Sequence, residues 1–197
     1  MKRILPILAL AAISSFAGGL KYGADAAGVL TMPSFSGDGS PDSKIGFGGK
    51  IAVAGQYDVN ELFSVRGNVG YLLTTWGFKR DDVDYDAKGN EITTSSDVDA
   101  TSHFVTIGVD AIYKPVSKFQ ILAGPSIDIP VSGSYSGGIS GDIEDDQASV
   151  SVEAGLGYEI TPDISVNAKY KLALTDYIKD DVKLNQVQVG VSYNFGN

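Results

Sequence analysis

The chain has 197 residues, contains no cysteine and carries a formal net charge of −9 at pH 7. Its length fits one domain, and without cysteine it must be stabilised by burial and backbone pairing alone. So acidic a chain is a poor nucleic-acid binder, because nucleic-acid affinity depends on basic residues that neutralise phosphates.

The N-terminus has the pattern of a secretory signal peptide. Two basic residues precede an apolar run over residues 4–13, and small residues precede an expected cut after Ala17. The apolar run is too short to cross a bilayer as a helix, and no later apolar run reaches the roughly 18 residues that such a helix needs. We therefore expect residues 1–17 to be a signal peptide and residues 18–197 to be one β-barrel domain. Removing the signal leaves 13 basic and 24 acidic residues, a net charge of −11.

Eight segments after the signal alternate between apolar and polar residues with a period of two, as β-strands do. Each has roughly the 9 to 11 residues that a tilted membrane strand needs. The predicted strands cover residues 21–30, 45–57, 63–73, 103–113, 119–129, 150–160, 164–174 and 187–195.

Two places interrupt this alternation. Trp76 and Phe78 follow the third strand on the wrong parity, which predicts an extension beyond the membrane or a position past a bulge. Pro125 lies within the fifth strand and lacks a backbone N–H, which predicts a bulge or a local opening of the ladder.

The connections between the strands alternate between long and short. Three short turns lie at one end, together with both ends of the mature chain. Four longer polar connections lie at the other end and cover residues 31–43, 79–102, 132–146 and 175–183; the first and third are rich in Gly, Ser and acidic residues. The second of these has a turn-like centre and is expected to form a hairpin outside the membrane. This asymmetry is typical of an outer-membrane barrel, whose periplasmic turns are short and whose extracellular loops are long.

Side-chain size and charge decide which face of each strand points outward. Opposite the Val, Ile, Leu and Tyr residues lie mainly Gly, Ala, Ser, Asn and Gln, with few charges. Small polar side chains fit the narrow interior of an eight-stranded barrel. A soluble lipocalin-like barrel has the opposite polarity, with apolar residues inside. We therefore expect the apolar face to contact lipid.

Aromatic residues on the apolar face gather beside the short turns and the chain ends, where a periplasmic aromatic girdle belongs. A soluble protein has no reason to collect them at one level. The predicted girdle consists of Tyr22, Tyr57, Phe63, Tyr113, Phe119, Tyr158 and Phe195.

The last predicted strand ends in a recognisable motif. Gln188, Gly190, Tyr193 and Phe195 are spaced polar-x-Gly-x-x-aromatic-x-aromatic, which resembles the C-terminal insertion signal of outer-membrane barrels, although two residues follow the final aromatic. The first strand, K-Y-G-A-D-A-A-G-V-L, resembles that of PorT-like and OmpX-like barrels. As a pattern, the whole mature chain resembles small eight-stranded outer-membrane barrels of the OmpA/OmpX and PorT-like kind.

This resemblance implies an all-β fold, an eight-stranded antiparallel up-and-down transmembrane β-barrel in the cell outer membrane. It also implies contact with outer-membrane lipid and lipopolysaccharide, insertion by the barrel-assembly machinery, and a monomer. Most members of the family are not enzymes, and the resemblance implies a narrow or pore-less barrel that anchors extracellular loops.

Ionisable residues on the inward face fall near the middle of six strands, and buried charges are tolerated when paired. We expect an acid–base pair on strands one and two, another on three and four, and a third on six and seven. This predicted salt-bridge belt fills the lumen and consists of Asp25, Lys50, Arg66, Asp110, Glu153 and Lys169. The functional alternative is an ion or proton path, which such a narrow lumen disfavours.

His103 is the only histidine, so a hydrolase would have to use it. Barrel-type lipid A deacylases use a histidine and a serine on the lipid-facing side. His103 shares that parity, but Val105 stands where the serine belongs, and Ser102 lies on the other face. The nucleophile and base of a triad therefore cannot be assembled, and we expect no catalytic site.

The run Asp82-x-Asp84-x-Asp86 resembles the start of a calcium loop. Ala87 then occupies the position that needs glycine, and Thr93 the position that needs a bidentate glutamate. A solvated loop is the favoured interpretation, with weak divalent binding as the alternative.

Together these patterns predict an outer-membrane barrel with a structural or surface-interaction role, a plugged lumen and acidic extracellular loops, without enzymatic activity or cofactor. The alternatives are a soluble periplasmic lipocalin-like binding barrel and a lipid-modifying outer-membrane enzyme. The ligand of the loops is not predicted.

Overall fold

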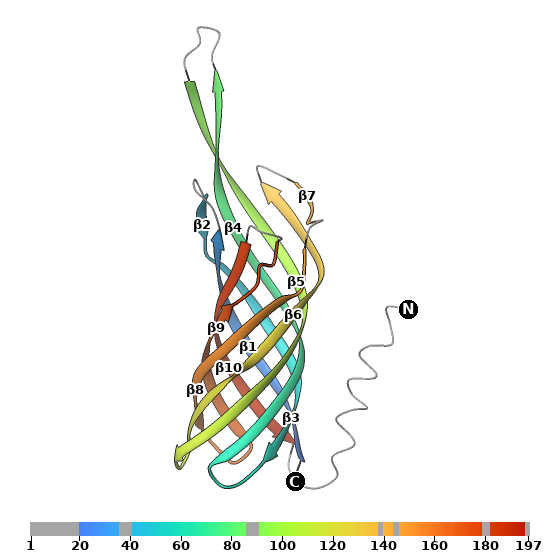
Figure 1. Ribbon diagram of the computed structural model, residues 1–197, viewed down its shortest axis with the longest axis vertical. Helices are drawn as coiled ribbons and strands as arrows, with labels where there is room; N and C mark the ends of the chain where they lie inside the picture. The colour runs from blue at the N-terminus through green and yellow to red at the C-terminus, as the bar shows by residue number, and fades with distance from the viewer. Residues whose placement is uncertain are drawn as a thin grey trace, which may run out of the picture.

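The computed structural model describes residues 20–35, 41–85, 91–137, 140–143, 146–178 and 182–195. They form one antiparallel sheet that closes on itself as a tall barrel, with strands strongly tilted relative to the barrel axis (Figure 1). Within these ranges no helix is long and apolar enough to cross a membrane.

Eight strands make the ring, and two short strands lie at the end with the long connections. The ring strands are β1 (Leu20–Phe35), β3 (Gly46–Asp58), β4 (Phe63–Tyr85), β5 (Glu91–Val116), β6 (Phe119–Gly137), β8 (Ser149–Glu159), β9 (Ile164–Ala173) and β10 (Val182–Phe195). The short strands are β2 (Asp42–Lys44), which pairs with β4, and β7 (Gly141–Asp142), which pairs with β6. The predicted eight-stranded up-and-down barrel is therefore confirmed.

Pairing between the first and last strands closes the ring. β1 and β10 are antiparallel from Tyr22 opposite Phe195 to Phe35 opposite Val182. Each of the eight ring strands pairs with two neighbours, so the ring has no free edge at membrane depth. Closure satisfies the backbone hydrogen bonds that an open sheet would leave unpaired in lipid.

Several strands are longer than the sequence pattern predicts. β4 and β5 pair without interruption from Phe63 opposite Tyr113 to Tyr85 opposite Glu91, so they continue as a hairpin beyond the rest of the barrel (Figure 1). Polar side chains do not prevent backbone pairing, so much of what the sequence predicts as loop is strand. The turn-like centre of this connection lies outside the described residues.

The exposed apolar side chains lie on the outside of the barrel. Ile51 is 66% exposed and Val189 is 62% exposed, whereas their neighbours Lys50 and Gln188 are buried in the lumen. A soluble barrel would present the polar residues instead. The outward assignment of the apolar face is therefore confirmed, and the lipocalin-like alternative has the wrong polarity.

The structure distinguishes between the two expectations for Trp76. β4 continues in one register past this residue to Tyr85, as the expected extension requires, and no bulge reverses the parity. Trp76 shares the inward face with Leu72 and Thr74 and is only 1% exposed. The wrong parity in the sequence marks the point where apolar side chains move from the outer face to the lumen.

Pro125 produces a local opening. Pairing between β5 and β6 runs to Gly108 opposite Ser126 and resumes at Ala111 opposite Ala123 in the same register. Val109 and Asp110 are left out of this ladder. A Cβ atom on Gly124 would lie 1.7 Å from the carbonyl oxygen of Val109, so only glycine fits beside the opening.

Replacing Val109 by arginine tests the outward face of β5. Val109 is 45% exposed on the lipid side, so the charge should destabilise the folded barrel by about 2 to 4 kcal/mol in lipid vesicles. Val116 is 63% exposed at the end of β5 beside the short turn, where arginine should cost about 1 kcal/mol or less. Urea unfolding of the two variants measures the difference. Equal stability of Val109→Arg and wild type would show that β5 faces the other way.

Candidate functional site

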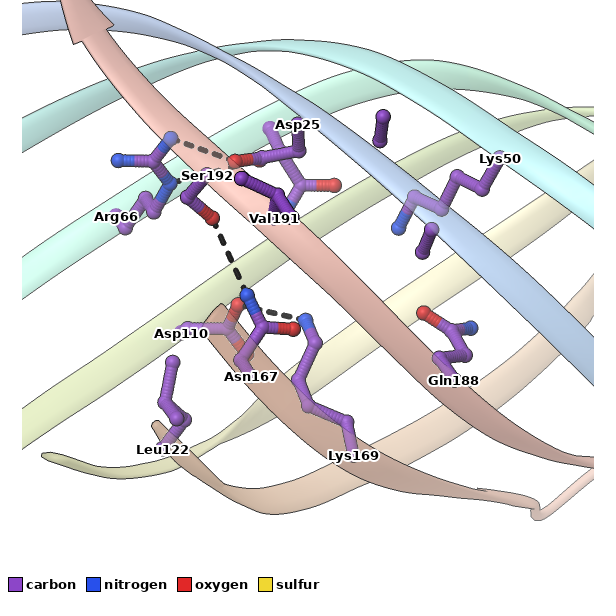
Figure 2. A pocket seen from close by; sticks show the side chains of 13 residues that line it. Asp25, Lys50, Arg66, Asp110, Leu122, Asn167, Lys169, Gln188, Val191 and Ser192 are labelled. Carbon is purple, nitrogen blue, oxygen red and sulfur yellow. Dashed lines mark hydrogen bonds and ion pairs between the residues drawn. The ribbon is translucent and has the colours of Figure 1, made fainter. Parts of the chain in front are cut away.

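Arg66 organises the ion pairs in the part of the lumen nearest the short turns. Its side chain is buried, and Nη2 lies 2.7 Å from Oδ1 of Asp25 on β1 (Figure 2). Nη1 donates to Oδ1 of Asn194 at 2.8 Å and to Oε1 of Gln56 at 3.2 Å. The guanidinium therefore joins side chains of four strands, as its fixed fork of donors allows.

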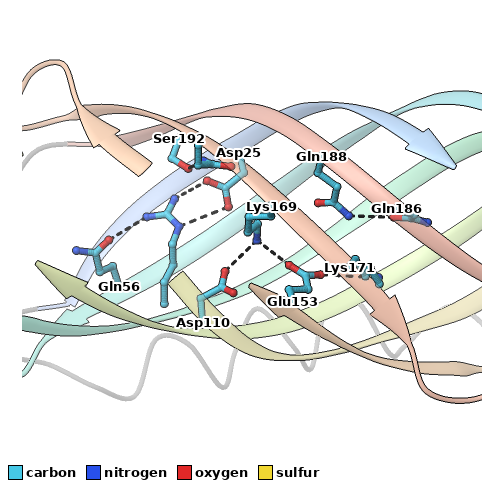
Figure 3. Close-up of polar contacts among 11 residues, drawn as sticks. Asp25, Gln56, Asp110, Glu153, Lys169, Lys171, Gln186, Gln188 and Ser192 are labelled. Carbon is cyan, nitrogen blue, oxygen red and sulfur yellow. Dashed lines mark hydrogen bonds and ion pairs between the residues drawn. The ribbon is translucent and has the colours of Figure 1, made fainter. Parts of the chain in front are cut away.

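A second group of charges fills the middle of the lumen. Nζ of Lys169 lies 3.0 Å from Oδ2 of Asp110 and 2.7 Å from Oε2 of Glu153 (Figure 3). Lys171 is fully buried, and its Nζ lies 2.6 Å from Oδ2 of Asp128 and 3.8 Å from Oε1 of Glu153. We call these five residues the central ion cluster.

The partners differ from those that the sequence predicts. Arg66 stands directly opposite Asp110 in the β4–β5 register, yet it contacts Asp25 on β1. Asp110 contacts Lys169 instead, and Lys50 forms no ion pair with any described residue. Long side chains in a narrow barrel reach across the lumen, so neighbouring positions on adjacent strands do not determine partners. Glu153 and Lys169 do contact each other.

Sequence reasoning missed two members of the central ion cluster. Asp128 stands between the outward residues Ile127 and Ile129, and Lys171 lies two residues after Lys169. Both therefore have inward parity, and that signal was sufficient to find them.

Toward the end with the long connections, the lumen becomes apolar. The buried side chains there form one cluster, which we call the aromatic plug. It consists of Val29, Leu72, Trp76, Ala100, Phe104, Ile143, Tyr177, Val182 and Leu184. Ile143 and Tyr177 belong to connections between ring strands, so two loop segments contribute to the plug. Small polar residues such as Thr31, Thr74 and Ser102 are also buried at this level, so the expectation of a small, polar interior holds only in part here.

Ser102 forms hydrogen bonds with two aromatic residues of the plug. Its Oγ accepts hydrogen bonds from Nε1 of Trp76 at 3.0 Å and from Oη of Tyr177 at 3.2 Å. The two rings meet edge to face, with centroids 6.2 Å apart. Burial raises the pKa of Tyr177 to about 12, against the opposing effect of its hydrogen bond to Ser102, so this hydroxyl stays protonated at neutral pH.

His103 lies on the outer face of β5. Its Nδ1 is 2.5 Å from Oη of Tyr71 on β4, also on the outer face. Ser102 is fully buried in the plug on the opposite face, so it does not meet the imidazole.

The other predicted sites lie as follows. The aromatic residues predicted as a girdle lie beside the short turns and chain ends, with Phe63 and Tyr113 stacked at 4.8 Å between centroids. Within the proposed insertion signal, Gln188 faces the lumen, whereas Tyr193 and Phe195 face outward. The structure does not describe the side chains of the calcium-like run, Asp82 to Asp86. Among the residues that it does describe, no group of His, Cys, Asp or Glu side chains could hold a metal ion.

A double-mutant cycle distinguishes the observed partner of Arg66 from the predicted one. Arg66→Met should destabilise the barrel by about 2 to 4 kcal/mol, because it leaves the carboxylate of Asp25 without its cation. Adding Asp25→Asn should recover part of this loss, whereas adding Asp110→Asn should not. Urea unfolding in lipid vesicles gives the free energies. Stronger coupling of Arg66 to Asp110 than to Asp25 would contradict this geometry.

Comparisons with known proteins agree with this architecture. The Yersinia pestis attachment invasion locus protein, Ail, is similar at 17% identity over 89% of this chain and 98% of that chain, with a TM-score of 0.51. Neisserial surface protein A (NspA) is similar at 20% identity over 90% of this chain and 98% of that chain, with a TM-score of 0.52. No curated protein matches the sequence.

Residues 4–195 match the sequence profile of a family described as "Outer membrane protein beta-barrel domain". The match covers nearly the whole chain, and the lipid-compatible outer face fits it. The chain is therefore an outer-membrane protein and belongs to the outer membrane protein beta-barrel domain family.

Proposed function

We propose that this barrel is a non-catalytic membrane anchor that presents an acidic surface outside the cell. The distribution of charge carries the proposal. The four connections at the long-loop end, residues 31–43, 79–102, 132–146 and 175–183, contain 16 acidic and 5 basic residues. The rest of the mature chain contains 8 acidic and 8 basic residues. The net charge therefore belongs to the connections, and the formal charges of the remaining chain balance.

A surface of this charge selects its partners by sign. Its field attracts cationic surfaces and repels polyanions, and both effects weaken as salt screens the charges. The partners that fit are basic segments of other proteins or divalent cations that bridge the surface to other anionic groups. Outer-membrane lipid and lipopolysaccharide surround the barrel itself. We expect the barrel to act as a monomer after insertion by the barrel-assembly machinery, for which Tyr193 and Phe195 provide the signal.

The described side chains that fill the interior suit a structural support better than a wide channel. The central ion cluster and the aromatic plug occupy successive levels of the interior. An ion crossing it would have to displace a paired charge and then pass the plug. Fixed internal packing of this kind holds the strands that carry the loops in place, which favours a plugged barrel.

The position of His103 disfavours the lipid-modifying alternative. Its ring contacts the hydroxyl of Tyr71, and the neighbouring Ser102 accepts two hydrogen bonds inside the plug. A serine used in this way cannot reach lipid to attack an acyl group.

Binding of charged polymers tests the proposed surface. Vesicles containing the protein should bind fluorescent polylysine in low salt, lose it at high salt, and not retain heparin at any salt concentration. A matched variant changes the four aspartates at positions 81, 82, 84 and 86 to asparagine, and should bind polylysine more weakly. Retention of heparin, or unchanged polylysine binding by the variant, would contradict the proposal.

A further inference from the structure

Lys50 is an unusual cation within the lumen. It lies on β3, is only 6% exposed, and forms neither a hydrogen bond nor an ion pair with any residue that the structure describes. Arg66, Lys169 and Lys171 each contact a carboxylate within 3.0 Å. Burying an ammonium group without partners is costly, so something has to solvate it.

The amine of Lys50 points into a cavity. Figure 2 shows it directed toward the space between the Arg66–Asp25 pair and Lys169. The cavity has a volume of about 30 Å³. Asp25, Asp110 and Gln188, whose side chains carry acceptor oxygens, also line it. The unpaired ammonium group therefore shares this small space with groups that can accept hydrogen bonds from bound water.

The volume and the lining match water. A buried water needs roughly 10 to 15 Å³ of such volume and two to four polar partners, so this cavity holds about two. A small anion fits less well, because the carboxylates of Asp25 and Asp110 line the same cavity and would repel it. A metal cation is disfavoured by Lys50 itself.

The charge balance of the lumen favours the ammonium form of Lys50. The central ion cluster contains three carboxylates and two ammonium groups, which leaves one negative charge in excess. Both carboxylate oxygens of Asp128 accept hydrogen bonds from Lys171. Oε1 of Glu153 is buried and makes no hydrogen bond. With Lys50 charged, the acidic and basic groups deep in the described lumen balance.

We propose that this cavity binds two water molecules, and that they solvate the Lys50 ammonium as the counter-cation of Glu153, which it balances without direct contact. Lys50 is thus a positioning residue: its charge balances the one excess negative charge of the central ion cluster. The inference concerns the lumen alone and does not depend on the proposed surface role.

A double-mutant cycle tests the charge balance. Lys50→Met keeps the side-chain size but removes the charge, and should shift the folded-to-unfolded ratio about tenfold or more toward unfolding. Glu153→Gln alone should also destabilise, because it weakens the contact with Lys169. The double variant should be more stable than the sum of the two effects predicts, because the remaining two acids and two bases are balanced.

Asp25→Asn provides the matched control, because Asp25 lines the same cavity but forms its ion pair with Arg66. Its effect should add to that of Lys50→Met. Urea unfolding in lipid vesicles measures all variants. Additive effects of Lys50→Met and Glu153→Gln, or equal coupling of Lys50 to Asp25, would overturn the assignment of Glu153.

A crystal structure of the wild-type protein tests the water site without any variant. Crystals grown in bromide should show two water peaks in the cavity, at least one of them within hydrogen-bond distance of Nζ of Lys50, without anomalous signal. A bromide peak at Lys50 would assign an anion site instead. An empty cavity, or Lys50 in direct contact with Glu153, would equally overturn the proposal.

Discussion

Lipid tails offer no hydrogen bonds, so every backbone amide and carbonyl group at membrane depth has to find its partner within the protein. In this chain the pairing of β1 with β10 meets that requirement, because it closes the sheet and removes its edges. Closure with eight strands fixes the width of the barrel, and an interior of that width has space only for side chains. The outer face then has to be apolar, and the inner face has to fill a narrow core with groups that satisfy one another.

The two halves of the lumen meet this demand by different chemistry. From the short turns to the middle of the lumen, Arg66 and the central ion cluster pair charges from several strands, and Lys50 is the buried cation there without a direct ion pair to a described residue. Breaking such a pair is costly because it leaves the remaining charge buried without a partner. Near the long connections, rings and aliphatic side chains pack together, and Ser102 satisfies the two polar atoms that Trp76 and Tyr177 bring. Tyr177 lies between β9 and β10, so loop and barrel share one core.

Strand periodicity made the fold accessible from sequence, because a two-residue alternation assigns each side chain to one face wherever the register is regular. It placed Val109 outside and Lys50 inside without any structure. Periodicity does not say how far a side chain reaches or which partner it meets. Arg66 passes over the residue opposite it, Asp110, because Asp25 lies within its reach across the narrow lumen. The plug was missed because Tyr177 comes from a connection with no alternation, and because Trp76 was interpreted by hydrophobicity when its parity already placed it inside.

The plugged lumen that we propose would leave no continuous aqueous path, and ion conductance measures that property directly. We expect purified protein in a planar bilayer to show no steady single-channel current above background at moderate voltage. The reason is that a passing ion would have to separate buried ion pairs and then cross the plug around Trp76. Large, steady currents from the wild-type protein, of the size that a wide water-filled pore gives, would contradict this account of the interior.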